Sequence, residues 1–290
     1  MHNPTDPFTD GKAVLITGCS SGIGRQTAIA LAKYGFHVFA TVRKEVDAEN
    51  LRGLSLPNLV PICPLDLTNF EHITDTARAV ANELNNCGMK GLYALVNNAG
   101  SGSPAPIELM ELEQFRTELQ ARVLGSVAMV QAFLPLIRRA NGRIIWIVTP
   151  GLIPTPYVTS IHACDFAINC IARTLDIELK PWQIPNVLIK CGGIKTPAGS
   201  RTTTDVEAVL KKEPRERVSL YEQALREWAK DMAEFDKKRT EPEKVAEIVL
   251  KALIAKQPKS RYSIGHMVKA VNFLEAMPQS IADRILKMRF

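Results

Sequence analysis

The chain has 290 residues, 46% of them hydrophobic and 23% charged, so it can bury a full core and is too apolar to be disordered. Its formal charge of +6 comes from 36 basic and 30 acidic residues spread along the sequence, which suits an anionic ligand and argues against nucleic-acid binding. The six cysteines form no Cys-x-x-Cys pair, so neither a zinc site nor a disulfide scaffold is expected.

The N-terminal segment predicts neither a leader nor a membrane anchor. Residues 1–11 are polar and include Asp6 and Asp10, and no apolar run is expected to reach the ~18 residues that cross a bilayer. We therefore expect a cytoplasmic protein. Internal repeats and linker-like stretches are absent from the sequence, which predicts a single domain over residues 1–290.

From Lys12 onward, short apolar runs alternate with helix-length amphipathic segments. The first run, Ala13 to Ile16, precedes a helical period from Gly24 to Tyr34. Further strands are expected at residues 37–42, 59–64, 94–97, 143–148 and 186–190, with a last short one at 261–265. This alternation predicts an α/β fold, a Rossmann-type doubly wound parallel sheet with helices on both faces.

Residues 197–240 interrupt the alternation. They contain two charged helical segments, at 205–212 and 219–237, and the second carries an apolar stripe that includes Trp228. Their position suggests a helical lid over a pocket, with Trp228 contacting the substrate. The alternative is a surface helical hairpin with ordinary packing.

A glycine-rich turn joins the first strand to the first helix. It reads Thr-Gly-Cys-Ser-Ser-Gly-Ile-Gly over residues 17–24, so its backbone N–H groups can approach a pyrophosphate at a helix N-terminus. The fourth strand ends in Asn-Asn-Ala-Gly at 97–100, and Asp66, after the third strand, could accept a hydrogen bond from adenine. Together these features resemble the short-chain dehydrogenase/reductase family over residues 12–265.

The resemblance implies a dinucleotide held by these segments and by the turn at 191–196. The implied contacts are Gly18, Ser20, Ser21, Gly22, Ile23, Gly24, Asp66, Asn98, Ala99, Gly100, Ile194 and Thr196. The second strand is followed by Arg43, where an acidic residue would accept from a free ribose 2′-hydroxyl. Since an arginine binds a 2′-phosphate, NADPH/NADP+ is the predicted cofactor.

Four catalytic residues of the family, an asparagine, a serine, a tyrosine and a lysine, are altered here. The resemblance places Arg122 at the asparagine position and Thr149 at the serine position. It places Ile161 and Asp165 at the tyrosine and lysine positions, one helical turn apart and on one face. An isoleucine cannot protonate an alkoxide, so ordinary ketone reduction is not expected.

A hydride acceptor that is already cationic, such as an iminium carbon, would need no acid. Asp165 is then the candidate counter-ion, and Arg122 would orient it or hold a substrate carbonyl. Thr149 would donate to a substrate carbonyl or cap its own turn, and Ile161 and His162 would line the substrate site. Alternatively, Arg122 and Asp165 form a buried salt bridge in a cofactor-binding protein without turnover.

An arginine and an aspartate at these positions resemble the fungal bifunctional NADPH-dependent reductase/Diels–Alderases of prenylated indole alkaloid biosynthesis, of the malbrancheamide and paraherquamide type. The resemblance implies reduction of an iminium in a dipeptide-derived substrate, then an intramolecular [4+2] cycloaddition to a bicyclo[2.2.2]diazaoctane alkaloid. It also implies a homodimer or homotetramer, paired through helices at 111–137 and 161–179. One further alternative is a steroid- or retinoid-type carbonyl reductase in which Tyr157 or His162 replaces the acid.

Overall fold

The computed structural model describes residues 9, 11–100, 102–150, 153–197, 202–211 and 215–289. Seven strands form one parallel sheet in the order β3-β2-β1-β4-β5-β6-β7. The strands are β1 (Ala13–Ile16), β2 (His37–Thr41), β3 (Leu59–Ile62), β4 (Leu92–Asn97), β5 (Arg143–Val148), β6 (Asn186–Cys191) and β7 (Arg261–Ile264). The predicted doubly wound sheet is confirmed, and its order reverses between β1 and β4, where such folds bind their ligands.

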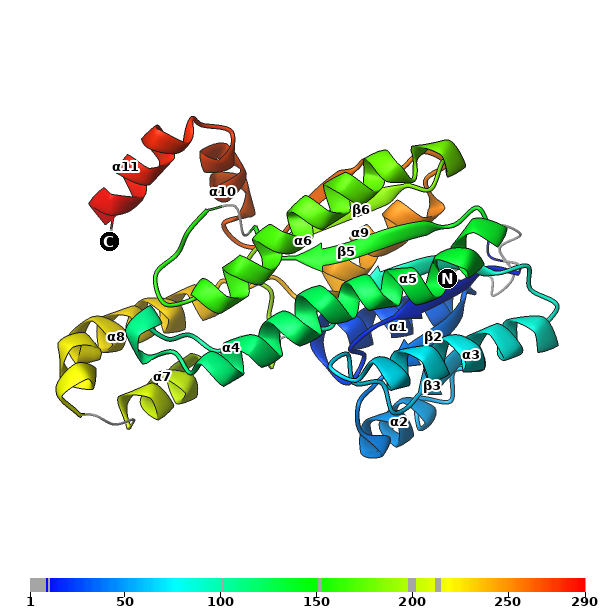
Figure 1. Ribbon diagram of the computed structural model, residues 1–290, viewed down its shortest axis with the longest axis horizontal. Coiled ribbons are helices and arrows are strands. Elements are labelled where there is room, and N and C mark those ends of the chain that lie inside the picture. The colour runs from blue at the N-terminus through cyan, green and yellow to red at the C-terminus, as the bar shows by residue number, and fades with distance from the viewer. Residues whose placement is uncertain are drawn as a thin grey trace.

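Helices cover both faces of this sheet, and two groups of them extend beyond the carboxyl ends of the strands (Figure 1). The elements are α1 (Gly22–Tyr34), α2 (Glu45–Arg52), α3 (Phe70–Asn86), η1 (Ile107–Leu109), α4 (Leu112–Leu119), η2 (Gln120–Leu124), α5 (Gly125–Arg139), α6 (Thr159–Glu178), η3 (Lys180–Trp182), α7 (Thr202–Leu210), α8 (Arg215–Asp236), α9 (Pro242–Ile254), α10 (Val268–Glu275) and α11 (Gln279–Arg289). The pairs α7–α8 and α10–α11 both lie at that end of the molecule.

The core consists of two apolar layers, one on each face of the sheet. Successive residues of β1 point to opposite faces, so Val14 packs with Leu31 of α1 while Leu15 packs with Phe133 of α5. Because helices cover both faces, β1 is buried along its whole length. This explains why its sequence is a continuous apolar run and does not alternate with polar residues.

A third, smaller apolar cluster, named the lid cluster after the predicted lid, joins α7 and α8 to the body of the protein. Val209 of α7 and Leu225 and Trp228 of α8 pack with Ala105 and Leu109. The predicted helices at 205–212 and 219–237 are observed at Thr202–Leu210 and Arg215–Asp236. These two helices are therefore held by their own hydrophobic contacts, separate from the layers on the sheet.

Among the described residues, α4, η2 and α5 form one continuous helical stretch, Leu112–Arg139, that is long and apolar enough to cross a membrane by length and composition. The expectation that no run reaches this length was therefore wrong. The stretch is weak evidence for a membrane span, since core helices pass the same test. Met129, Phe133 and Ile137 of α5 are fully buried in the layer against the sheet.

Candidate active site

The turn between β1 and α1 is shaped by three glycines. Gly18 and Gly22 have φ angles of +73° and +55°, a region that side chains rarely adopt. A Cβ on Gly24 would lie 2.3 Å from the carbonyl oxygen of Gly18, and one on Gly18 would lie 2.9 Å from Cα of Ala99. The turn is therefore closed too tightly for larger residues.

The ends of β1 and β4 are joined by hydrogen bonds beside this turn. The Thr17 hydroxyl oxygen accepts from the backbone N–H groups of Asn98 and Ala99, each at 2.9 Å. The side-chain amide of Asn98 donates to the carbonyl oxygen of Thr17, also at 2.9 Å. These bonds fix the crevice at the point where the strand order reverses.

The N-terminus of α1 opens into this crevice. Its N-cap residue, Ser21, is extended and makes no side-chain capping bond, and the first turn holds no acidic residue. The backbone N–H groups of that turn can therefore bind an anion, which fits the pyrophosphate of a dinucleotide. Ser20 and Ser21 are exposed at the turn.

The two residues expected from the 191–196 turn differ in placement. A Cβ on Gly22 would lie 3.1 Å from Cγ2 of Thr196, so Thr196 lies across the glycine turn. Ile194 is 4% exposed and, with Ile23 packed against the same layer, belongs to the core. Any contact of Ile194 with a nucleotide would therefore come from its backbone.

Arg43 and Asp66 lie at neighbouring strand ends, after β2 and β3. Arg43 is exposed. Burial favours a raised pKa for Asp66, but hydrogen bonds from the backbone and hydroxyl of Thr68, with the charges of Arg43 and His72, hold the pKa below its ordinary value. The Asp66 carboxylate is therefore ionised and able to accept a hydrogen bond.

Arg122, Thr149 and Asp165 are brought together by three different elements. Arg122 lies in the π-helical turn η2, a distortion that often marks functional positions, and its Nη2 donates to Asp165 Oδ1 at 2.5 Å. The other oxygen of Asp165 accepts from the Thr149 hydroxyl at 2.5 Å and from its backbone N–H at 3.2 Å. Asp165 is 3% exposed. Arg122 also packs beneath Gly100.

This arrangement is the buried salt bridge that the sequence left as an alternative. The positive charge of Arg122 compensates the negative charge of Asp165, so the pair presents a fixed dipole to the site. Behind the pair lies a cavity of about 20 Å³, large enough for one water molecule. Asn97 lines this cavity, and its side-chain amide is buried without a hydrogen-bond partner in the described part of the chain.

His162 and Tyr157, the two candidate acids, are occupied otherwise. Burial lowers the pKa of His162, although Asp165 and a hydrogen bond to the backbone of Ile153 oppose the shift. The ring is therefore neutral at pH 7. The Tyr157 ring packs edge-on against Trp228, with centroids 5.7 Å apart, so both belong to the lid cluster.

Two residues that sequence reasoning missed lie beside Ile161. Glu118 is 9% and Ser160 2% exposed, and within the described residues neither Glu118 Oε2 nor Ser160 Oγ has a hydrogen-bond partner. A Cβ on Gly102 would lie 2.4 Å from Cγ1 of Ile161 and 2.8 Å from this Glu118 oxygen, so the two side chains are neighbours. The sequence could have indicated Glu118 by its spacing, because it precedes Arg122 by four residues and so lies on the same helical face.

Glu118 and Ser160 line a cavity of about 200 Å³ between α4, α6 and α7. The carboxylate-bearing residues Glu111 and Asp205 also line it, and the remaining wall is mostly apolar, with Phe115 among its residues. The other Glu118 oxygen accepts from the backbone N–H of Ser103 at 3.2 Å. The cavity therefore combines an apolar wall with a fixed, acidic end.

Known proteins resemble this chain along its whole length. The family described as short chain dehydrogenase matches residues 12–207. "Uncharacterized oxidoreductase YbbO" of Escherichia coli K12 is 31% identical over 99% of both chains. "Estradiol 17-beta-dehydrogenase 2" of Rattus norvegicus is 32% identical over 97% of this chain and 75% of its own. "3-amino-tetrahydro-pyrrolizinone reductase" of Xenorhabdus hominickii is 30% identical over 89% and 88%, respectively.

Solved structures share the fold. A short-chain dehydrogenase of Streptomyces avermitilis matches with a TM-score of 0.74 at 23% identity, over 96% of both chains. One of Burkholderia cenocepacia, in complex with NADP, matches with a TM-score of 0.71 at 22% identity, over 95% of this chain and 98% of its own. These likenesses show the fold. With its Rossmann-type sheet and its matched residues 12–207, the chain belongs to the short-chain dehydrogenase family of oxidoreductases.

Proposed function

We propose that this oxidoreductase uses NADPH to reduce a cationic iminium carbon. The observation that carries the proposal is the environment of Ile161. Its neighbours are the buried carboxylate oxygen of Glu118 and, one helical turn along α6, the Arg122–Asp165 pair. Such a site supplies negative charge, and position 161 holds an isoleucine in place of a phenol that could protonate an alkoxide.

The proposed chemistry needs no proton donor at position 161. The Gly18–Gly24 turn would hold the pyrophosphate of NADPH and Arg43 its 2′-phosphate, and the cofactor would supply a hydride. Addition of that hydride to an iminium carbon consumes the positive charge and gives a neutral amine. The residues of the chain therefore have to attract, orient and desolvate the cation, and have no proton to deliver.

Glu118 and Asp165 contribute differently to holding a cation. A carboxylate about 4 Å from a positive charge contributes on the order of 4 kcal/mol at an effective dielectric of about 20, before desolvation is subtracted. The charge of Asp165 is already compensated by Arg122 at 2.5 Å, which reduces its share. Glu118 Oε2 has no donor among the described residues, so we assign it the larger part.

The substrate class that we propose is a prenylated indole with a bicyclic, dipeptide-derived core, as in the Diels–Alderase resemblance. The apolar wall of the 200 Å³ cavity supports this class, because it offers room for a branched alkenyl group. Holding that alkene against the reduced azadiene would favour an intramolecular [4+2] cycloaddition by removing an entropic barrier. The relative from Xenorhabdus hominickii, named for reduction of a pyrrolizinone, also supports a nitrogen heterocycle as substrate.

NADPH oxidation with a panel of hydride acceptors tests the proposal. A cyclic iminium salt is expected to be turned over, whereas the matched ketone is not, and chiral chromatography would show whether a prenylated precursor gives one cycloadduct enantiomer. NADH at equal concentration is expected to react more slowly, because it has no 2′-phosphate for Arg43 to bind. Turnover of the ketone without turnover of the iminium would refute the proposal.

A carbonyl reductase of steroid or retinoid type is the second candidate, favoured by the identity with the rat estradiol dehydrogenase. It requires a relocated acid. Tyr157 packs in the lid cluster and His162 is neutral, which argues against both. Under this candidate, oxidation of estradiol or retinol would be measurable. A scaffold without turnover would instead bind NADPH and leave it unoxidised with every acceptor of the panel.

A further inference from the structure

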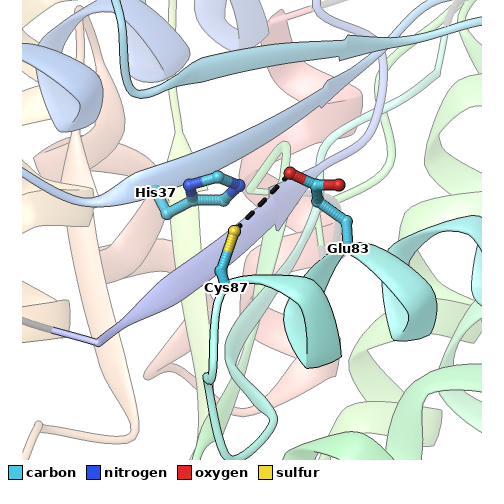
Figure 2. A group of neighbouring side chains, drawn as sticks. All are labelled: His37, Glu83 and Cys87. Atoms are coloured by element: carbon cyan, nitrogen blue, oxygen red, sulfur yellow. Dashed lines mark hydrogen bonds between the residues drawn. The ribbon is translucent and has the colours of Figure 1, made fainter.

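A second group of reactive side chains lies at the end of the sheet opposite the glycine turn. His37 is the first residue of β2, whereas the glycine turn follows the last residue of β1, and the two strands are parallel. Glu83 lies in the last turn of α3, and Cys87 directly follows that helix. Figure 2 shows the three side chains facing one another, with Cys87 Sγ 3.5 Å from Glu83 Oε1.

We propose that His37, Glu83 and Cys87 bind a Zn²⁺ ion, with water as the fourth ligand. Their ligand atoms all lie within 4.8 Å of one another. In a tetrahedral site with bonds of about 2.0–2.3 Å, the ligand atoms are roughly 3.4–3.8 Å apart. The cysteine and glutamate atoms already satisfy this spacing, so binding needs only a movement of about 1 Å between the histidine and the other two.

The histidine is placed to act as a ligand. His37 Nε2 is buried, and no residue in the described ranges gives it a hydrogen-bond partner, which is costly for a ring nitrogen. The ring is held edge-on against Phe39, with centroids 4.9 Å apart. His37 Nε2 therefore has no partner among the described residues, and its ring faces the carboxylate and the thiol. Both facts support metal binding independently of the distances within the cluster.

The ligand set selects the class of metal. One imidazole nitrogen, one thiolate and one carboxylate oxygen suit Zn²⁺, whereas Mg²⁺ and Ca²⁺ prefer oxygen ligands alone. Glu83 and Cys87 are four residues apart, so one helical turn presents both to the ion. The sequence offered no Cys-x-x-Cys signal, because the third ligand comes from a strand 46 residues before Glu83.

The position of this site implies a structural role. The ion would join the start of β2 to the end of α3, two elements that are otherwise held together by the apolar layer containing Phe39 and Leu84. It would lie away from Arg122 and Asp165, which stand at the carboxyl ends of the strands. We therefore expect zinc to raise the stability of the protein without changing its turnover.

Cobalt substitution of the full-length protein, kept reduced, tests the site. Co²⁺ is expected to give a thiolate-to-metal charge-transfer band that saturates at one equivalent and disappears when Zn²⁺ is added. Zinc at about 100 times its Kd is expected to raise the Tm by on the order of 5 °C. Cys87→Ser should lose the band and the Tm shift, whereas Cys170→Ser, a control at another exposed cysteine, should keep both.

Two results would overturn the proposal. One is the absence of a charge-transfer band, or a band that persists in Cys87→Ser. The other concerns the remaining ligands: His37→Gln and Glu83→Gln are each expected to weaken Co²⁺ binding at least tenfold, and wild-type affinity in either variant would remove that residue from the site. Because Glu83 is only partly buried, its variant remains informative even if His37→Gln does not fold.

Discussion

Arg122 and Asp165 depend on each other for their burial. Their side chains are 13% and 2% exposed, so removal of one charge leaves the other desolvated without a partner. We predict that Asp165→Asn lowers the free energy of unfolding by about 3–5 kcal/mol, measured by urea denaturation.

The matched control for this prediction removes both charges. Arg122→Met combined with Asp165→Leu should recover most of the lost stability, because apolar replacement of a buried ion pair is often neutral. A change below about 1 kcal/mol in Asp165→Asn alone would show that the pair contributes little to the fold.

Glu118 is the residue at which charge and fold can be separated. Glu118→Gln keeps a carbonyl oxygen for the Ser103 N–H group but removes the negative charge beside Ile161. We predict a roughly 10- to 100-fold fall in kcat/KM for an iminium substrate, with an unchanged Tm. Glu113→Gln, at a surface ion pair on the same helix, is the control and should retain wild-type activity. Equal activity of both variants would remove Glu118 from the site.

Among the elements, the β1–α1 turn has the strictest geometry. A methyl group on Gly24 would approach the Gly18 carbonyl oxygen to 2.3 Å, so the turn must open. We predict that Gly24→Ala weakens NADPH binding by more than tenfold in a fluorescence titration. Gly53→Ala, at a helical C-cap with its nearest neighbour at 3.5 Å, should bind normally. An affinity within twofold of wild type for Gly24→Ala would contradict this account of the turn.

The strands were predictable from sequence wherever a local pattern determines them. β1 and β5 begin and end at the predicted residues, because β1 is a continuous apolar run and β5 is such a run preceded by one arginine. β4 begins at Leu92, two residues earlier than predicted, because Leu92 pairs with Ala13 across a shift in register. Register depends on the neighbouring strand, which the local pattern of residues 94–97 does not contain.

In the candidate site too, local sequence determines some parts and contacts between distant segments determine others. The glycine turn and Arg43 belong to single segments, and their places at strand ends could be predicted. The contact of Arg122 with Asp165 was foreseen only as an alternative, since it joins residues 43 positions apart. Glu118 and Ser160 were missed because their cavity exists only where α7 packs against α4 and α6. Tertiary packing therefore determines the part of the site that we propose contacts the substrate.

Two partly buried histidines, His37 and His162, give the stability of the molecule a dependence on pH. Burial lowers the pKa of both His37 and His162 below the ordinary value of 6.5. Below pH 6.5 the unfolded chain therefore binds protons that the folded chain does not, so stability is present above this pH and is lost as the pH falls. We predict a falling Tm from pH 7 to pH 5, with at most about 1.4 kcal/mol per pH unit from each histidine.

His162→Gln tests the origin of this dependence. The variant cannot be protonated at this position, so the slope of stability against pH should be shallower than that of the wild type between pH 7 and pH 5. The measurement is urea denaturation at each pH. Parallel curves for the two proteins would show that the protonation of His162 does not contribute to acid unfolding.

The outer faces of α4, η2 and α6 indicate how the whole molecule assembles. Large apolar side chains are exposed there, with Leu112 at 77%, Leu124 at 51% and Ile177 at 75%. α4 and η2 both contact α6, so these residues lie on neighbouring elements. The stretch Leu112–Arg139 is therefore apolar on the side that packs on the sheet and also carries apolar residues outward, which suits pairing of two copies better than exposure to water.

We predict that the wild-type chain sediments as a homodimer or homotetramer. Leu124→Glu combined with Ile177→Glu should shift it toward the monomer at micromolar concentration, because a charged side chain inside the interface would be desolvated without a partner. Leu220→Glu, at an equally exposed leucine on lid helix α8, should leave the sedimentation coefficient unchanged. A monomeric wild type would contradict the predicted assembly, and a double variant that stays assembled would place the contact elsewhere. Since α6 carries Asp165 and η2 carries Arg122, dissociation is also expected to lower turnover by loosening the elements that hold this pair.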